Sequence, residues 1–202
     1  GDPGLPELHG REARARLAWR YDGQDSAVVP SSGLRAGTTI DYIAESPDPP
    51  PGTATDRLND GITQLDINGS QVWSVRRNDR VFLTGGVGTT WGHPLANEQF
   101  HLGAPLRLGA FDVGALRGDH YAVIAAGYLR GIGRLPDFLG GPIFLGGWLE
   151  SGSAFDDLDD ATVKTNLSVG AIAETLVGPV LLGGSFDLGG AWRYYIGIGR
   201  LF

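Results

Sequence analysis

The chain has 202 residues, of which 23 are acidic and 16 basic, giving a net charge of −7, and it lacks cysteine and methionine. This length suits one domain, the negative charge argues against a nucleic-acid partner, and the lack of cysteine excludes disulfides and thiolate metal sites. The sequence contains no run of about 18 apolar residues, so no transmembrane helix is predicted. The missing initiator methionine indicates a processed or excised chain, and no signal peptide is present.

The N-terminal residues 1–11 are polar and rich in proline and glycine, which predicts a tail or linker before one domain at 12–202. Apolar and polar residues then alternate, as expected for strands, whose successive side chains face opposite sides of a sheet. Strands are predicted at 12–22, 34–44, 62–75, 81–91, 120–130, 143–151, 162–175, 180–187 and 192–202. The glycine-rich segment at about 92–119 lacks alternation and is predicted to be a long loop.

Short turns and long loops alternate along the chain. The predicted turns at 76–79 and 177–179 are short, whereas the connections at 45–60 and 153–160 are long and polar. This asymmetry is typical of transmembrane β-barrels, and the near-zero mean hydropathy fits alternating lipid-facing and lumen-facing side chains. The sequence therefore predicts an all-β, antiparallel transmembrane barrel. Because bacterial barrels have even strand numbers, the nine strand segments leave three alternatives: the arginine-rich segment 12–22 pairs irregularly, one strand is not recognised, or the barrel is incomplete. About eight closing strands (range eight to ten) are preferred, with the place of segment 12–22 left open.

The last strand is apolar and aromatic on one face. Tyr194, Ile196, Ile198, Arg200 and Phe202 share that face, and Gly197 and Gly199 lie on the other. A soluble protein rarely leaves such a strand at a sheet edge, because it invites aggregation. A barrel needs a closing strand of about this length.

Several segments, taken in order, resemble one known family. Residues 100–111 (FHLGAPLRLGAF) and 116–118 (LRG) resemble the lumen-entering sixth loop of the BamA-like outer-membrane insertase and translocase superfamily, also called the bacterial surface antigen family. Segments 21–25 (YDGQD) and 30–33 (PSSG) are similar to its Asp-x-x-Asp…Pro-x-x-Gly motif, and 144–152 (FLGGWLESG) resembles the strand that receives the loop. The closest resemblance is to the barrels of patatin-like phospholipases of type V secretion, here in shortened form, since most of the family has sixteen strands.

The resemblance implies a function and a location. It implies a bacterial outer-membrane protein acting in protein insertion, secretion or translocation, or in anchoring a passenger, without enzymatic activity of its own. The implied partners are outer-membrane lipid, the outer-membrane assembly machinery, a protein client or passenger, and a second copy paired through the first and last strands.

The resemblance also assigns residues to two sites. The family's Val-Arg-Gly-Phe/Tyr loop motif aligns with 108–111, so Gly109 stands where the arginine is expected and Phe111 keeps the aromatic position. Arg107 or Arg117 is the expected replacement cation, with Glu150 or Asp187 as its acceptor, because a charge-assisted contact would pin the loop. The second site is the C-terminal assembly signal, with Tyr194, Ile196, Ile198 and Phe202.

No catalytic, metal or cofactor site is predicted. The histidines His9, His93, His101 and His120 lack metal-ligand spacing, and no Gly-x-Ser-x-Gly nucleophile motif occurs. The acidic segment 156–160 is interpreted as a solvated loop. Two alternatives stay open: a small outer-membrane enzyme acting on lipid, with His93, His101 or His120 as its base, and a soluble β-sandwich or lipocalin-like binder.

Overall fold

A nine-stranded antiparallel sheet dominates the computed structural model, which describes residues 13–26, 29–45, 61–92, 94 and 98–199. Its strands are β1 (Ala13–Asp22), β2 (Gly33–Glu45), β3 (Ile62–Arg76), β4 (Asp79–Trp91), β7 (His120–Arg134), β8 (Gly140–Phe155), β9 (Lys164–Thr175), β10 (Gly178–Asp187) and β11 (Trp192–Ile198). Two short strands, β5 (Phe100–Leu102) and β6 (Leu116–Gly118), form a separate pair. A 3-10 turn at Leu158–Asp160 follows β8.

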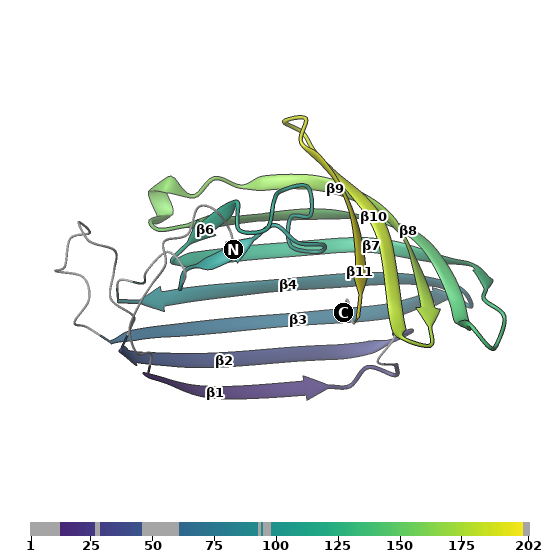
Figure 1. The fold of residues 1–202 in the computed structure, drawn as a ribbon, viewed down its shortest axis with the longest axis horizontal. Helices are drawn as coiled ribbons and strands as arrows, with labels where there is room; N and C mark the ends of the chain where they lie inside the picture. The colour runs from purple at the N-terminus through teal and green to yellow at the C-terminus, as the bar shows by residue number, and fades with distance from the viewer. Residues whose placement is uncertain (1–12, 27–28, 46–60, 93, 95–97, 200–202) are drawn as a thin grey trace.

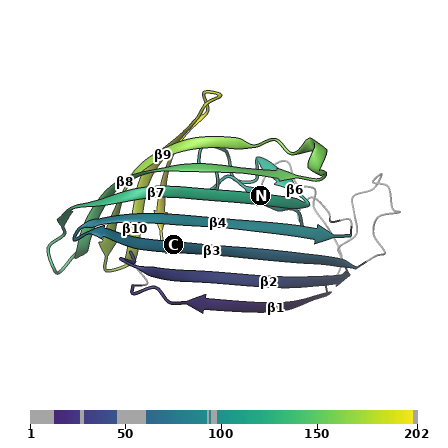
Figure 2. The ribbon, with the colours of Figure 1, turned by 180° about the vertical axis from the view of Figure 1, so that it is seen from behind.

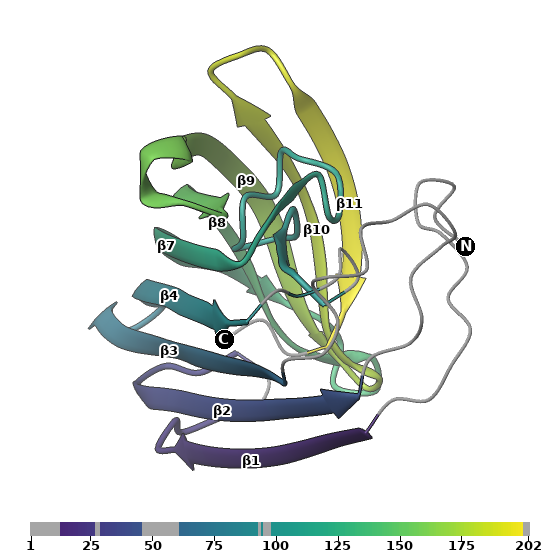
Figure 3. The ribbon, with the colours of Figure 1, turned by 90° about the vertical axis from the view of Figure 1, so that its left-hand side faces the viewer.

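The large sheet is a continuous meander that curves strongly. Neighbours follow the order β1-β2-β3-β4-β7-β8-β9-β10-β11, so only the β4–β7 connection departs from a simple hairpin series. β10 and β11 run steeply across the direction of β1 to β4 (Figure 1), and the view from behind shows β1 to β4 and β7 side by side (Figure 2). Seen along the strands, the sheet is an arc with the β4–β7 segment inside it (Figure 3).

The predicted all-β antiparallel fold is confirmed, but barrel closure is not seen. Within the described part of the chain, β1 and β11 are edge strands and do not pair with each other. Segment 12–22 forms β1 and pairs with β2 along its whole length, with one register shift at its start. Of the three alternatives for the odd strand number, the open sheet agrees with an incomplete barrel. The predicted tail at 1–11 lies outside the described residues.

The two faces of the sheet have opposite character. On the outer, convex face of β9, Leu167 and Val169 are 53% and 48% exposed, whereas the inward-facing Asn166 and Ser168 are 1% and 0% exposed. The same alternation gives exposed leucine, isoleucine, valine and aromatic side chains on the outer face of the other strands. The sheet therefore has an apolar outside and a partly polar inside, the reverse of a soluble sheet with one solvated face.

The core lies between the concave face and the segment that joins β4 to β7. One buried cluster joins Leu106 of this segment to the sheet residues Phe82, Leu129, Phe144 and Trp148, among others. A second cluster joins Leu102 and Leu108 to residues of β7. The inner face thus buries its apolar side chains against a loop of the same chain.

The two-residue β3–β4 and β9–β10 turns lie at one end of the sheet, called here the short-turn end, together with the longer β1–β2 and β7–β8 connections. The segments that join β2 to β3, β4 to β7 and β8 to β9 lie at the opposite end, called here the long-loop end, together with the short β10–β11 turn. The backbone N–H of Gly199 donates to the carbonyl of Pro179, which places the end of β11 at the short-turn end. No helix among the described residues is long and apolar enough to cross a membrane.

Candidate loop-docking site on the inner face

The segment between β5 and β6 folds as a compact inner loop, defined here as residues 103–115. Backbone hydrogen bonds join Gly103 and Ala104 to Arg107, and Phe111 to Leu108. Leu106 and Leu108 have φ of 64° and 67°, values that non-glycine residues rarely adopt and that cost about 1–3 kcal/mol each. Both leucine side chains are buried against the sheet, and that packing offsets the backbone strain.

Glu150 on β8 is the central anchor of the inner loop. Its side chain is fully buried, and Oε2 accepts a hydrogen bond of 2.9 Å from the backbone N–H of Gly109. Its Oε1 accepts from Trp148 Nε1 at 2.7 Å and from Ser168 Oγ at 2.8 Å. Three neutral donors therefore converge on this carboxylate and compensate part of its desolvation cost.

A row of hydroxyl groups continues from Glu150 across the neighbouring strands. Ser168 Oγ on β9 lies 2.5 Å from Ser185 Oγ on β10, which lies 3.2 Å from the hydroxyl of Tyr195 on β11. Asn166 Nδ2 also donates to Ser168 Oγ at 3.1 Å. The row connects four adjacent strands on their inner face and ends at the carboxylate that holds the loop.

Arg107 forms the second anchor, toward β7 and β3. Its guanidinium carbon lies 4.8 Å from the ring centroid of Tyr121, a cation–π arrangement. The Tyr121 hydroxyl donates to Asp66 Oδ2 at 2.6 Å, and Asp66 Oδ1 also accepts from Asn68. Arg107 thus contacts the ring of Tyr121, and the Tyr121 hydroxyl contacts the carboxylate of Asp66.

Arg193 forms the third anchor, on the edge strand β11. Its NH1 group donates to the carbonyl of Phe111 at 2.8 Å and lies 3.5 Å from Asp112 Oδ1. Phe111 itself is partly buried and packs against the second core cluster. The three anchors hold the inner loop across the concave face, from β3 and β7 to β11.

The predicted loop cations and their expected acceptors make the following contacts. Glu150 does receive the loop, but through the Gly109 backbone, whereas Arg107 contacts Tyr121. Arg117 Nε donates to the carbonyl of Gly114, at the base of the loop. Asp187 accepts from the N–H of Ala191 and so supports the β10–β11 turn.

Gly109 explains why a backbone group replaces the arginine. A Cβ atom added there would lie 2.7 Å from Ser185 Oγ, closer than ordinary packing allows, and 3.4 Å from the Tyr195 ring. The glycine therefore brings its N–H within reach of the carboxylate at a point where a long side chain would not fit.

Ser168, Ser185, Tyr195, Tyr121 and Arg193 were missing from the predicted site. Their signal in the sequence is weak: each is a polar or amphipathic residue on the inward face of its strand. Alternation identifies that face, but the part of it that the loop covers depends on the tertiary path of residues 103–115. Only the structure shows that path.

The arginine-rich β1 carries a further inner-face contact. Arg16 Nε and NH2 lie 2.6 and 2.8 Å from the two carboxylate oxygens of Asp41 on β2, and Arg14 lies 3.9 Å from the same group. Asp41 is buried, so this bidentate pair places charge on the inner face.

The Asp-x-x-Asp…Pro-x-x-Gly segment forms the turn between β1 and β2. Asp25 accepts hydrogen bonds from the N–H groups of Ser31 and Ser32 and from the Ser31 hydroxyl. Burial pushes the pKa of Asp25 upward, but these hydrogen bonds outweigh it and hold the pKa below its ordinary value. Gly33, with φ of 115°, closes the turn where a Cβ would collide with the carbonyl of Gly23.

The histidines and the C-terminal strand complete the predicted residues. His120 Nδ1 lies 2.8 Å from Thr89 Oγ1, and His101 is exposed, while His93 lies outside the described residues. No three His, Asp or Glu side chains in the described ranges gather closely enough to bind a metal ion. Tyr194, Ile196 and Ile198 are exposed on the outer face of β11, and Phe202 falls outside the described residues.

Comparison with models of known protein families and with curated proteins finds no match to this sequence. The resemblance to the BamA-like superfamily therefore stays a prediction, carried by the motifs quoted above.

Proposed function

We propose that this chain forms the membrane-spanning wall of a bacterial outer-membrane β-barrel that acts in protein insertion, secretion or anchoring of a passenger. The observation that carries the proposal is the inverted sheet, with an apolar, exposed outer face and a polar, loop-filled inner face. Monomeric soluble proteins rarely expose contiguous apolar patches larger than a few hundred Å². A lipid bilayer solvates this apolar outer face favourably. In that orientation the two-residue β3–β4 and β9–β10 turns lie on the periplasmic side.

The two edge strands are the proposed binding surface for a partner. β1 and β11 are unpaired on their outer sides within the described residues, so each offers backbone N–H and C=O groups to another strand. A client strand, a passenger segment or a second copy of the chain would add there by backbone hydrogen bonding. β11 also carries the proposed signal for the assembly machinery.

The membrane location is tested with the full chain refolded in detergent or with lipid vesicles. The folded protein should migrate differently on SDS gels before and after boiling, and should float with the vesicles in a density gradient. A chain that stays monomeric and folded without detergent, with no shift on boiling, would instead support the soluble lipocalin-like binder.

The edge pairing is tested in the cysteine-free chain. The double variant Ala18→Cys/Gly197→Cys places one thiol on β1 and one on β11 and is oxidised in vesicles. A disulfide-linked dimer supports pairing of two copies, and a disulfide within one chain supports a closed seam. Free thiols in both strands would leave the edges to a client and contradict both pairings. Each single variant serves as a control.

A further inference from the structure

The edge strand β1 is open to a partner on its inner face as well as along its backbone. All ten of its residues are exposed, whereas the anchors of the inner loop lie on other strands, chiefly β7, β8 and β11. The Arg16 side chain is 56% exposed although it binds Asp41. A further charged group can therefore reach this face from the unpaired edge.

Positive charge dominates the inner face of β1. Alternation places Arg14, Arg16, Ala18, Arg20 and Asp22 on this face. Arg14 and Arg16 lie 3.9 and 2.6 Å from the same carboxylate of β2, that of Asp41. Arg20 lies opposite Gly37, which has no side chain, and Asp22 lies opposite a further arginine, Arg35. Carboxylates on a strand added at the other side of β1 would be attracted to this face.

The direction of β1 restricts which strand can pair with it. All nine strands are antiparallel to their neighbours, so β1 and β11 both run from the long-loop end to the short-turn end. Joining β1 to β11, within one chain or between two copies with the same orientation in a membrane, would give a parallel pair. Bacterial outer-membrane barrels are antiparallel, and parallel pairs are slightly less stable. An antiparallel partner of β1 runs from the short-turn end to the long-loop end.

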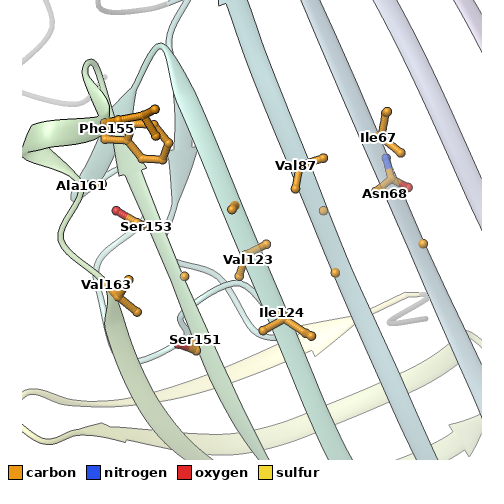
Figure 4. Close-up of a pocket in the computed structure, with 16 residues that line it drawn as sticks. Ile67, Asn68, Val87, Val123, Ile124, Ser151, Ser153, Phe155, Ala161 and Val163 are labelled. Carbon is orange, nitrogen blue, oxygen red and sulfur yellow. The ribbon is translucent and has the colours of Figure 1, made fainter.

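The outer face determines the other side chains of such a partner. Ile67 and Val87 are paired across β3 and β4 and are exposed, and Ile124 is exposed on β7 (Figure 4). β1 continues this apolar face with Leu17 and Trp19, which are 70% and 58% exposed. A strand added at β1 extends the same face, so apolar residues suit its outward positions and charged residues its inward ones.

We infer that the unpaired edge of β1 binds a strand of a partner polypeptide that runs from the short-turn end to the long-loop end and carries apolar residues outward and carboxylates inward. The partner's backbone extends the sheet, and its Asp or Glu side chains face Arg16 and Arg20. This inference rests on the proposed function, because lipid on one side and the lumen on the other distinguish the two faces. It deepens that proposal by giving the partner strand a direction and a charge.

The test uses the full chain in phosphatidylcholine vesicles with synthetic peptides of about ten residues, the length of a membrane-spanning strand. Valine alternates in them with glutamate, glutamine or lysine, and each peptide has one cysteine, at its N- or C-terminus. The protein carries Ala15→Cys near the start of β1 or Tyr21→Cys near its end, two outward positions roughly 20 Å apart. The parent chain has no cysteine, so each disulfide reports one pair of positions.

The glutamate peptide should cross-link to Ala15→Cys through its C-terminal cysteine and to Tyr21→Cys through its N-terminal cysteine, as antiparallel pairing requires. The lysine peptide should give at least about fivefold less product, with the glutamine peptide between them. Arg20→Glu should lower the yield with the glutamate peptide about threefold, and Arg77→Glu, in the exposed β3–β4 turn, should leave it unchanged. The net charge of −7 repels an acidic peptide, so its preference must come from local arginines.

Four results would overturn the inference. Cross-links between the opposite ends would show a parallel strand, and equal yields with the glutamate and lysine peptides would remove the charge requirement. Disulfide-linked protein dimers in place of peptide adducts would assign the edge to a second copy, and adducts with none of the peptides would exclude strand addition at β1. A protein that floats with the vesicles but gives one of these results loses only the partner strand. A protein that does not float loses the proposed membrane location as well.

Discussion

The carboxylate of Glu150 binds the inner loop through neutral groups. Its donors are a backbone N–H, an indole N–H and a serine hydroxyl, contributed by Gly109, Trp148 and Ser168. A hydrogen bond to a charged group is worth about 1.5–3 kcal/mol, and a donor left unsatisfied in a buried site costs a similar amount. The residue therefore contributes to stability mainly through the three groups that depend on it.

Replacing Glu150 should destabilise the folded protein. Glu150→Ala leaves three buried donors without their acceptor, so the free energy of unfolding in urea should fall by about 3 kcal/mol, and Glu150→Gln should fall between this variant and the parent. Tryptophan fluorescence in detergent reports the transition. Asp187→Ala removes a carboxylate that only supports an exposed turn and should cost less than about 1 kcal/mol. Equal losses in the two alanine variants would contradict the anchoring role.

At the scale of the element, the inner loop is held in a strained shape by its base and its anchors. Gly103 and Asp112 meet at the base, where φ of Gly103 is 114° and an added Cβ would lie 2.0 Å from the Asp112 carbonyl oxygen. Any side chain at this point must separate the two sides of the loop. The strained leucines at its tip depend on the same closure.

Gly103→Ala should therefore undock the inner loop. Gly190 is the matched control, because its φ is also positive, at 93°, but no atom lies within 4 Å of an added Cβ. Ala110→Cys gives a buried thiol in the cysteine-free chain. Its maleimide labelling should rise at least about tenfold with Gly103→Ala, as expected for about 1.4 kcal/mol or more of strain, and little with Gly190→Ala. Similar labelling in both backgrounds would show that the base does not hold the loop.

The β1–β2 turn should be sensitive to acid. Because the folded pKa of Asp25 is lowered, its contribution to stability is complete above the ordinary aspartate pKa of about 3.9 and is lost as pH falls through the lowered folded value. Proteolysis within the turn should therefore accelerate below about pH 4 in the parent. Asp25→Asn should be cleaved faster at neutral pH and lose this part of the pH dependence. An unchanged profile in the variant would count against the turn as the titrating element.

Strand positions could be predicted from this sequence because the two faces of the sheet differ in polarity, so alternation marks nearly every strand. A long connection at about 92–119 was also predictable, because alternation stops there, but the short strands β5 and β6 within it were not. The contacts of the loop were not, since the Gly109 N–H that binds Glu150 is a backbone group that every residue except proline carries. The partner of Arg107 was missed for a related reason: an aromatic face competes with carboxylates for arginine, and spacing alone does not choose between them.

At the scale of the whole molecule, the apolar outer face is the observation on which the proposed membrane location depends. The exposed apolar side chains extend from β1 to β11 and cover both edge strands. In water such a surface would drive association, whereas in a bilayer it is the solvated surface. The sequence predicts nine strand segments and favours about eight closing strands, whereas the structure has nine strands in an open arc. Alternation reveals strands but not which edges meet.

Val169→Arg tests the environment of this face. Val169 lies in the middle of β9 and faces outward, so a charge there should cost about 2–4 kcal/mol of folding free energy in a bilayer. On a water-exposed surface the same change would stay within about 0.5 kcal/mol. Val163→Arg, just before β9 at the long-loop end, should cost only about 0–1 kcal/mol. Refolding into vesicles with urea titration measures both, and equal small costs would argue against a membrane.

The hydroxyl row from Tyr195 to Glu150 makes loop docking depend on correct strand pairing. Ser168 lies opposite both Trp148 of β8 and Ser185 of β10 in the observed register. A one-residue slip of any of these strands would turn its polar residue to the outer face and break the row. The loop can therefore reach its docked state only after the last four strands have aligned, so its docking reports the fidelity of their assembly.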